Sequence, residues 1–208
     1  MSLITPWGYT FKTATALGDL ITVDEFNTRT ANKYAGDTRI PGAIASASQG
    51  LRDSVGWHLS PSEACVLKTT FFDNRVTVVN RGVHIQLPAR YVTGVTSVKI
   101  DDKAYTTYVL ETNGLLKVYG VPFVYFPQFA DIEIEYTAGL PEGLVNTLKD
   151  LTVNRVTKVL AQSYGVQSET AGGLSISYSA AWASDASAST LTAAEEAALA
   201  PYKLRGVF

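Results

Sequence analysis

Residues 141–165 read PEGLVNTLKDLTVNRVTKVLAQSYG, and this stretch has the pattern of a long amphipathic helix. Pro141 suits the first turn of a helix, and Gly165 suits its C-terminal end. Between them, side chains suited to a buried face recur every three or four residues: Leu144, Val145, Leu148, Leu151, Thr152, Val156, Val159 and Leu160. The opposite face carries Lys149, Asp150, Asn154, Arg155 and Lys158. Because an amphipathic helix must bury its apolar face, we expect this helix to pack against other helices of the chain.

Two helices are predicted in the first quarter of the chain. Thr22 and Glu25 have the spacing of a capping box, so a first helix should begin there and run to about Tyr34. Asp37 or Thr38 then caps a second helix. The buried face and the end of this second helix are marked by Ile40, Ile44, Ala47, Leu51, Val55 and Gly56. We expect residues 21–57 and 140–165 to form one small helical bundle.

Residues 65–138 have the pattern of short strands joined by turns. The predicted strands are 68–72, 76–79, 83–87, 95–100, 105–110, 115–119 and 132–136. Asn113-Gly114 lies between two of them and is a strong hairpin signal, for which both turn residues should take positive φ. The sequence therefore predicts an α+β fold, in which a helical bundle at 21–165 contains an antiparallel β-rich insert.

The two ends of the chain are predicted to be arms. In residues 1–20, Trp7, Tyr9 and Phe11 alternate with small or polar residues, which is typical of an extended segment or a short strand. This N-terminal arm can cover the protein's own core or reach a neighbouring molecule. Residues 166–208 form the predicted C-terminal arm.

The C-terminal arm combines four kinds of segment. We expect a flexible link at 168–173, a strand at 174–178 with no partner close in sequence, and a low-complexity stretch at 180–189. Thr192 and Glu195 then form a second capping box, which begins a short helix ending at Pro201. Such segments fold poorly alone but suit docking on another subunit.

Composition limits the classes of protein that this chain can be. Of its 208 residues 46% are hydrophobic and 17% charged, which supports a packed core and argues against disorder. The net charge of −2 argues against general nucleic-acid binding. No apolar run reaches the roughly 20 residues of a membrane span, and the N-terminus lacks a signal-peptide pattern, so we expect a protein made in the cytosol without membrane contact. The single cysteine, Cys65, sits in an apolar run and is predicted to be buried.

Candidate catalytic groups are few. The two histidines are His58, after the second predicted helix, and His84, predicted on the solvated face of a strand. The sequence contains no HExxH, CxxC, GxSxG, Walker A or GxGxxG motif, so no metal, cofactor or nucleophile site is predicted. Two alternatives stay open. The β region, with its aromatic loop at 123–129, could bind a carbohydrate or peptide, or a dispersed enzyme site could lie around His58 or His84.

The order of the segments resembles the head–tail connector proteins (adaptor or head-completion proteins) of long-tailed bacteriophages. The resemblance covers residues 21–208. In the first two-thirds of the chain its features are ITVDEF at 21–26, the helix at 39–56 with Trp57-His58, the hairpin VTSVKIDD at 95–102, and the strand at 132–139 with its following helix. Towards the C-terminus they are GVQSET at 165–170, the strand at 174–178, and AALAPYKLR at 197–205. No single motif is diagnostic, and the ordered set carries the resemblance. Residues 1–20 precede it.

The resemblance implies a structural, non-enzymatic protein of the virion neck, made in the bacterial host cytoplasm. Members of that family stand as a ring of about twelve copies beneath the portal protein, extend the DNA channel without sequence-specific DNA binding, and offer a platform to the next neck or tail protein. Their C-terminal segment docks on the portal or on a neighbouring copy. The residues of this chain that occupy the corresponding ranges are Leu174, Ile176, Tyr178, Leu199, Tyr202, Leu204 and Phe208.

Overall fold

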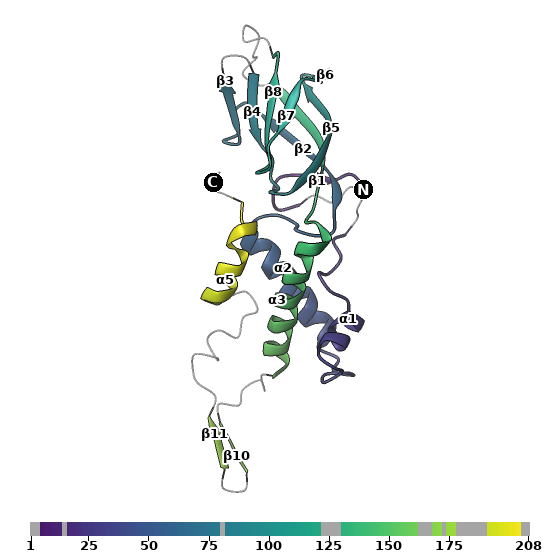
Figure 1. Cartoon of the computed structure of the whole chain (residues 1–208), viewed down its shortest axis with the longest axis vertical. Coiled ribbons are helices and arrows are strands. Elements are labelled where there is room, and N and C mark those ends of the chain that lie inside the picture. The colour runs from purple at the N-terminus through teal and green to yellow at the C-terminus, as the bar shows by residue number, and fades with distance from the viewer. Residues whose placement is uncertain are drawn as a thin grey trace. The chain divides into compact units, whose positions relative to one another are not determined.

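The computed structural model describes residues 5–13, 16–79, 82–121, 130–161, 168–171, 174–177 and 191–204 (Figure 1). These residues confirm the predicted α+β class. They divide into two compact units, each made of segments that are far apart in sequence. The β unit comprises Met1–Gly18, Val55–Gly143 and Tyr202–Phe208, and the helical unit comprises Asp19–Ser54 and Leu144–Pro201.

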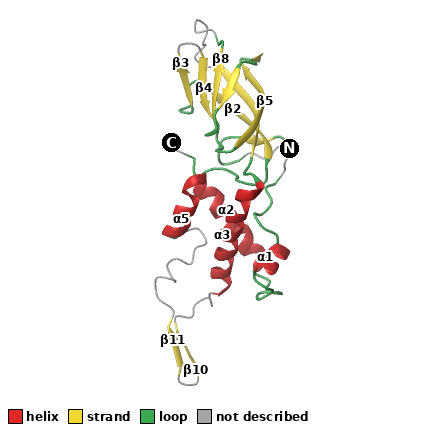
Figure 2. Ribbon diagram, in the orientation of Figure 1, coloured by secondary structure: helices red, strands yellow, loops and turns green. Residues whose placement is uncertain are grey.

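In its described residues the helical unit contains four helices: α1 (Val23–Arg29), α2 (Ile40–Val55), α3 (Glu142–Ala161) and α5 (Ala193–Leu199) (Figure 2). Its core joins the first three helices and is made of Ile21, Phe26, Ile40, Ala43, Ile44, Ala47, Val156 and Leu160. The long helix predicted at 141–165 is therefore present as α3, and the helices predicted before it are its partners. Gly165 lies outside the described residues.

One side chain of α3 differs from the prediction. Arg155 was expected on the solvated face, but it is only 4% exposed. The carboxylate of Glu195, on α5, acts electrostatically on Arg155 and also pairs with Lys158 of α3 at 3.1 Å. The polar side of α3 is thus partly covered by α5, which a helix pattern taken alone does not reveal.

The helix ends follow local capping chemistry with two differences. Thr22 Oγ1 accepts a hydrogen bond from the backbone N–H of Glu25, but the Glu25 carboxylate pairs with Arg29 and Lys149 instead of returning to the cap. Helix α1 ends at Arg29 instead of continuing to residue 34, since the left-handed φ angles of Ala31 and Asn32, 51° and 59°, cannot continue a helix.

The other predicted caps are present. Asp37 Oδ1 accepts from the N–H of Arg39 just before α2, and Gly56 follows α2 with a φ of 81°. At α5 the capping box is complete, because Thr192 and Glu195 each accept a hydrogen bond from the other's backbone N–H.

Among its described residues the β unit has two antiparallel sheets. Sheet A has the order β1 (Thr10–Phe11), β2 (Glu63–Thr70), β9 (Asp131–Ala138), β5 (Val92–Ile100) and β6 (Lys103–Ala104). Sheet B has the order β3 (Val76–Val79), β4 (Gly82–Gln86), β8 (Leu115–Tyr119) and β7 (Tyr108–Leu110). Each buries one face, with Leu67, Val98, Ile132 and Ile134 from sheet A and Val83, Ile85, Leu116 and Val118 from sheet B. The two sheets therefore form a sandwich whose inner faces make the core of the unit (Figure 1).

The N-terminal segment belongs to this sandwich. Thr10 and Phe11 pair with Val66 and Cys65 of β2, and Phe11 is fully buried. Residues 5–13 thus cover the protein's own core, which was one of the two possibilities for the predicted arm at 1–20. The aromatic loop at 123–129 lies outside the described residues.

One turn differs from its prediction, and a turn predicted at Asp101-Asp102 is present. At Asn113-Gly114 only Gly114 takes a positive φ, 79°, because the turn is longer than two residues and closes through Gly114 N–H to Glu111 C=O. The two-residue turn with positive φ at both positions occurs instead at Asp101 and Asp102, between β5 and β6.

The strand predicted at 174–178 has a partner close in sequence, contrary to the prediction. Strands β10 (Ser168–Ala171) and β11 (Leu174–Ser177) pair in an antiparallel hairpin, so residues 168–171 are not a flexible link. The paired ends Ala171 and Leu174 are separated in sequence by Gly-Gly, a dipeptide favoured in two-residue hairpin loops.

Candidate functional site

The histidine that follows α2 is buried inside the β unit. His58 is 0% exposed, and its Nε2 lies 2.9 Å from the carbonyl oxygen of Ala138. A carbonyl can only accept, so Nε2 carries a proton. In the neutral ring Nδ1 then accepts from the Tyr9 hydroxyl at 2.7 Å, and the same hydroxyl accepts from the His58 backbone N–H at 3.2 Å. His58 therefore links the N-terminal segment to β9.

This geometry gives His58 the environment of a core residue. The rings of Tyr9, Phe11 and Trp57 lie edge-on around it, with centroids 5.1 to 5.8 Å away. His84 is half-buried on β4, where its neighbours across the sheet are Thr77 and Lys117. Of the two histidines on which a dispersed enzyme site depends, His58 packs in the core of the β unit, and His84 lies on the outer face of β4 between the buried Val83 and Ile85.

The last described residues dock beside Trp57. The indole N–H of Trp57 donates to the carbonyl of Tyr202 at 2.8 Å. The ring centroid of Tyr91 lies 6.2 Å from that of Trp57 and 6.5 Å from that of Tyr202. Leu204 N–H donates to the carbonyl of Val55, which satisfies a backbone acceptor at the end of α2. Of the predicted docking residues, Tyr202 is 7% exposed and Leu204 half-buried against the chain's own residues.

Leu199, another predicted docking residue, is fully buried within the helical unit. Its helix α5 is held to α3 by the ion pair between Glu195 and Lys158. Burial alone would raise the pKa of Glu195, but the hydrogen bond from the Thr192 backbone and the charge of Lys158 outweigh burial and lower it. Glu195 therefore stays ionised in the first turn of α5.

The remaining predicted docking residues lie on or near the hairpin or at the chain end. Leu174 and Ile176 are the first and third residues of β11, while Tyr178 and Phe208 lie outside the described residues. The structure thus brings Leu174 and Ile176 together on one strand, but it places Leu199 in the helical unit and Tyr202 in the β unit.

The single cysteine is as buried as predicted. Cys65 is 1% exposed, and desolvation raises the pKa of its thiol to about 12. Its neighbour across the ladder, Tyr136, is 0% exposed, and burial raises the pKa of that phenol well above its ordinary value. Both groups are neutral at physiological pH, so Cys65 is a packing residue and not a reactive thiol.

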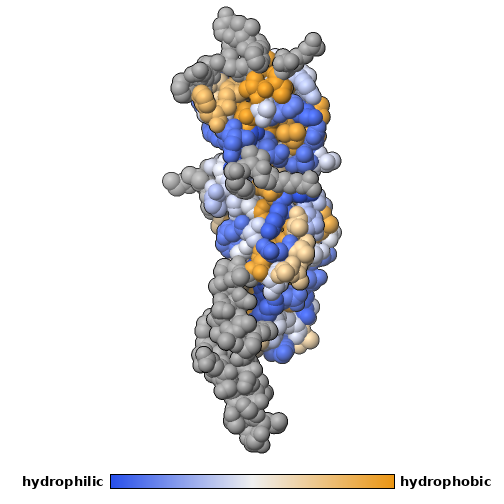
Figure 3. All heavy atoms as spheres, turned by 90° about the vertical axis from the view of Figure 1, so that its left-hand side faces the viewer, coloured by the Kyte–Doolittle hydropathy of each residue, from blue (hydrophilic) through white to orange (hydrophobic). Residues whose placement is uncertain are grey.

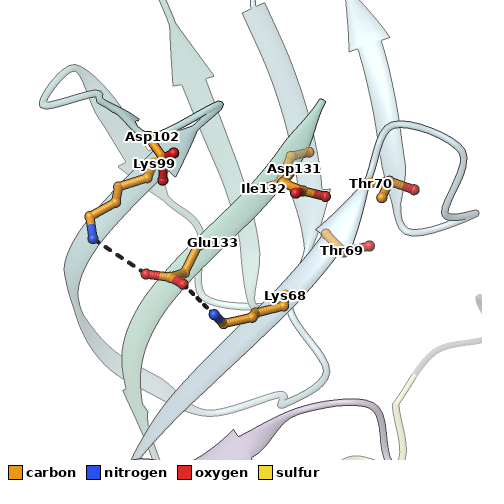
Figure 4. Close-up of a pocket in the computed structure, with 8 residues that line it drawn as sticks. All are labelled: Lys68, Thr69, Thr70, Lys99, Asp102, Asp131, Ile132 and Glu133. Atoms are coloured by element: carbon orange, nitrogen blue, oxygen red, sulfur yellow. Dashed lines mark hydrogen bonds and ion pairs between the residues drawn. The ribbon is translucent and has the colours of Figure 1, made fainter. Parts of the chain in front are cut away.

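The solvent-facing side of sheet A carries a row of charges across three strands. Glu133 on β9 pairs with Lys68 on β2 at 2.8 Å and with Lys99 on β5 at 3.4 Å (Figure 4). The hydrogen bond from Lys68 lowers the pKa of Glu133. Lys12 makes a similar pair with Glu135 one step along β9. The ion pairs of this row were not predicted, although the alternation of charged and apolar residues in each strand places these residues on the solvated face.

A pocket of about 310 Å³ includes the ion pairs of Glu133 with Lys68 and Lys99. Its lining consists of Lys68, Thr69, Thr70, Lys99, Asp102, Asp131, Ile132 and Glu133 (Figure 4). Charges of both signs line it, and the two lysines are already bonded to Glu133. Within the described residues, no group of three or more histidine, cysteine or acidic side chains is placed to hold a metal ion.

No protein-family model matches this chain, and no curated protein matches it. In the parts of the chain that the structure describes, no helix is long and apolar enough to cross a membrane.

Proposed function

We propose that this protein is a non-enzymatic connector of a bacteriophage virion, which forms a ring beneath the portal and joins the head to the tail. It is made in the host cytoplasm and incorporated into the neck of the particle. Its ring extends the DNA channel, and its partners are the portal, the next neck or tail protein and neighbouring copies of itself. The proposal rests on the resemblance in segment order and on three features of the structure.

The main support is the composition of the helical core. Ile44 from α2 and Val156 from α3 share one cluster with Phe26 from α1, although the β sequence separates α2 from α3. Helices that precede and follow the β insert in sequence thus pack in one core, which is the arrangement that the resemblance implies.

The second support is the β10–β11 hairpin. A two-stranded hairpin is marginally stable by itself in water and gains stability by adding to another sheet or packing on another surface. Leu174 and Ile176 are on this hairpin, whereas Leu199 and Tyr202 are buried in their own chain. The docking role therefore falls on residues 168–177 and not on α5.

The third support is the pairing of surface lysines. Lys12, Lys68 and Lys99 each contact a carboxylate of β9. Lysines bind DNA by releasing counterions from phosphates, and a lysine already paired with a carboxylate has less to gain from this exchange. A surface of this kind suits a channel through which DNA slides.

Sedimentation of the full chain with a purified portal ring tests this function. The chain should migrate with the portal, and a variant in which a Gly-Ser linker of equal length replaces residues 168–177 should not. The core cluster named above joins α1, α2 and α3, so the variant should keep the thermal midpoint of the parent. Equal portal binding by both chains would overturn the docking role of the hairpin, and absence of binding by the parent would overturn the connector.

The pocket on sheet A favours a second candidate, a β module that binds a carbohydrate or peptide. Its mixed charges would suit a ligand with both donors and acceptors. This function requires a saturable ligand for a monomeric chain, found by screening a glycan and peptide array, and loss of that binding in Lys99→Ala.

A further inference from the structure

Sheet B ends on each side in a strand with few of the usual protections against pairing. Its edge strands are β3, with sequence VTVV, and β7, with sequence YVL. Neither contains a charge or a proline. Natural edge strands are commonly protected by lysine, proline or a bulge, because an open edge is a template for another strand. Within the described residues, no strand pairs with the outer side of β3 or of β7.

The backbone groups on these two edges can be assigned from the ladder. Gln86 N–H donates to the carbonyl of Arg75, so in the antiparallel alternation residues 75, 77 and 79 face β4, and Val76 and Val78 face outward. On the other side, Tyr119 N–H donates to Thr107 and Glu111 N–H donates to Leu115. Tyr108 and Leu110 therefore turn their backbone groups away from β8.

The two edge strands of sheet B run in directions that allow them to pair with each other between copies. Its four strands are all antiparallel to their neighbours, so β3 and β7 run in opposite directions. Two copies placed side by side in the same orientation would meet through an antiparallel pair. Sheet A has five strands, so its edges β1 and β6 run in the same direction, and each has only two residues.

We infer that β7 of one copy pairs with β3 of the next, so that sheet B continues from subunit to subunit. The register that uses both edges fully places Val76 opposite Leu110 and Val78 opposite Tyr108. These four residues all lie on the inner-facing side of their strands, because Val76 pairs with the buried Ile85 and Leu110 with the buried Leu116. The same register places Thr77 opposite Val109 on the outer side.

Exposed apolar side chains on both edge strands support this pairing. Val78 on β3 is 38% exposed and Val109 on β7 is 51% exposed, so each edge presents an apolar side chain to solvent. Figure 3 views the molecule from the side on which β3 lies in Figure 1, and apolar side chains gather on this part of the β unit. The register also aligns the backbone of Arg75, which precedes β3, with that of Glu111, which follows β7, but the charged groups of both are engaged within their own chain. The guanidinium of Arg75 lies at the N-terminal segment beside Gly8, and Glu111 contacts Lys117.

Such a contact joins two different surfaces, so it repeats from copy to copy and closes into a ring when the rotation between copies allows it. The inference deepens the proposed connector function, since it names the edges by which ring neighbours bind. It can also fail independently, because a ring can be built through the helical unit instead.

Disulfide trapping tests the junction in the full chain. In the double variant Thr77→Cys/Val109→Cys, the new thiols are on the outer face, and the expected pair is not hydrogen-bonded, with Cα atoms about 4.5 Å apart. That distance allows a disulfide. Within one chain the same positions are about 14 Å apart, three strand spacings, which forbids one. Cys65 is buried and does not compete.

Oxidation of the double variant, alone over a concentration series and with a portal ring, should give a ladder of covalent multimers on a non-reducing gel. Each single variant, Thr77→Cys or Val109→Cys, can give at most a dimer and serves as the matched control. A double variant that gives no species larger than its controls overturns the inference.

The native mass of the unsubstituted chain separates this result from the proposed function. A closed ring without a ladder rejects the sheet junction and retains the connector. A ladder without any closed species, either for the free chain or on the portal, retains the junction and rejects the ring.

Discussion

The hydroxyl of Tyr9 and Nδ1 of His58 lie 2.7 Å apart in a fully buried part of the β unit, although 49 residues separate them in sequence. This bond fixes the N-terminal segment to the residues that follow α2. It also engages the imidazole nitrogen that a catalytic histidine would need to have available.

Replacement Tyr9→Phe tests the bond. The variant keeps the ring in the aromatic cluster but leaves a buried nitrogen without its donor, which costs about 1–3 kcal/mol of unfolding free energy. Urea denaturation measures this loss. Tyr119→Phe, on a side chain that is 38% exposed, is the control and should change stability by less than about 0.5 kcal/mol. Equal stability of Tyr9→Phe and the parent would show that the bond contributes nothing.

The Cys65 thiol provides a probe of the folded β unit. Because burial raises its pKa to about 12, the folded chain should not react with a thiol reagent at pH 8 on the time scale of minutes. Reaction should become complete in urea above the unfolding transition. The Thr77→Cys chain is the positive control and should react with one equivalent while folded. Rapid reaction of Cys65 in the folded parent chain would contradict the packing of β2.

Tyr202→Ala distinguishes a core residue from a docking residue. The side chain is 7% exposed beside Tyr91, so its removal should cost about 3 kcal/mol and lower the thermal midpoint. Val109→Ala, at a side chain that is 51% exposed, should have little effect on the midpoint. If Tyr202→Ala keeps the parent's midpoint and loses portal binding, Tyr202 serves a partner and not its own core.

Stability should depend on pH through Glu195. The pKa of this carboxyl is lowered in the folded state from 4.5, so its ionised form stabilises the fold above about pH 4.5, and the contribution disappears as pH falls through the lower folded value. Glu195→Gln should therefore cost about 1–2 kcal/mol at pH 7 and progressively less below pH 4.5. Glu196→Gln, in the same first turn but exposed, is the control. A Glu195→Gln penalty that is independent of pH would contradict the ionic role.

Features set by neighbouring residues could be predicted from the sequence. The cap at Thr192, the stop at Gly56 and the apolar face of α3 depend on residues within a few positions of one another, and all three are present. Local chemistry also contains the Gly-Gly signal between β10 and β11, although residues 168–173 were predicted to be a flexible link.

Features set by distant pairing could not be predicted. The assignment of Thr10 to a strand depends on Val66, and the burial of Tyr202 depends on Trp57, 145 residues away. The charge row on sheet A depends equally on the register that brings Lys68 and Lys99 to either side of Glu133. The alternation of apolar and polar residues predicts which side chains of a strand are buried, but it does not predict which strands pair with it.

Native mass spectrometry of the full chain, with and without a purified portal ring, tests the central claim most directly. The account predicts a closed species near twelve copies, or the same number of copies added to the portal. A chain that stays monomeric at all concentrations and does not bind its cognate portal would contradict it.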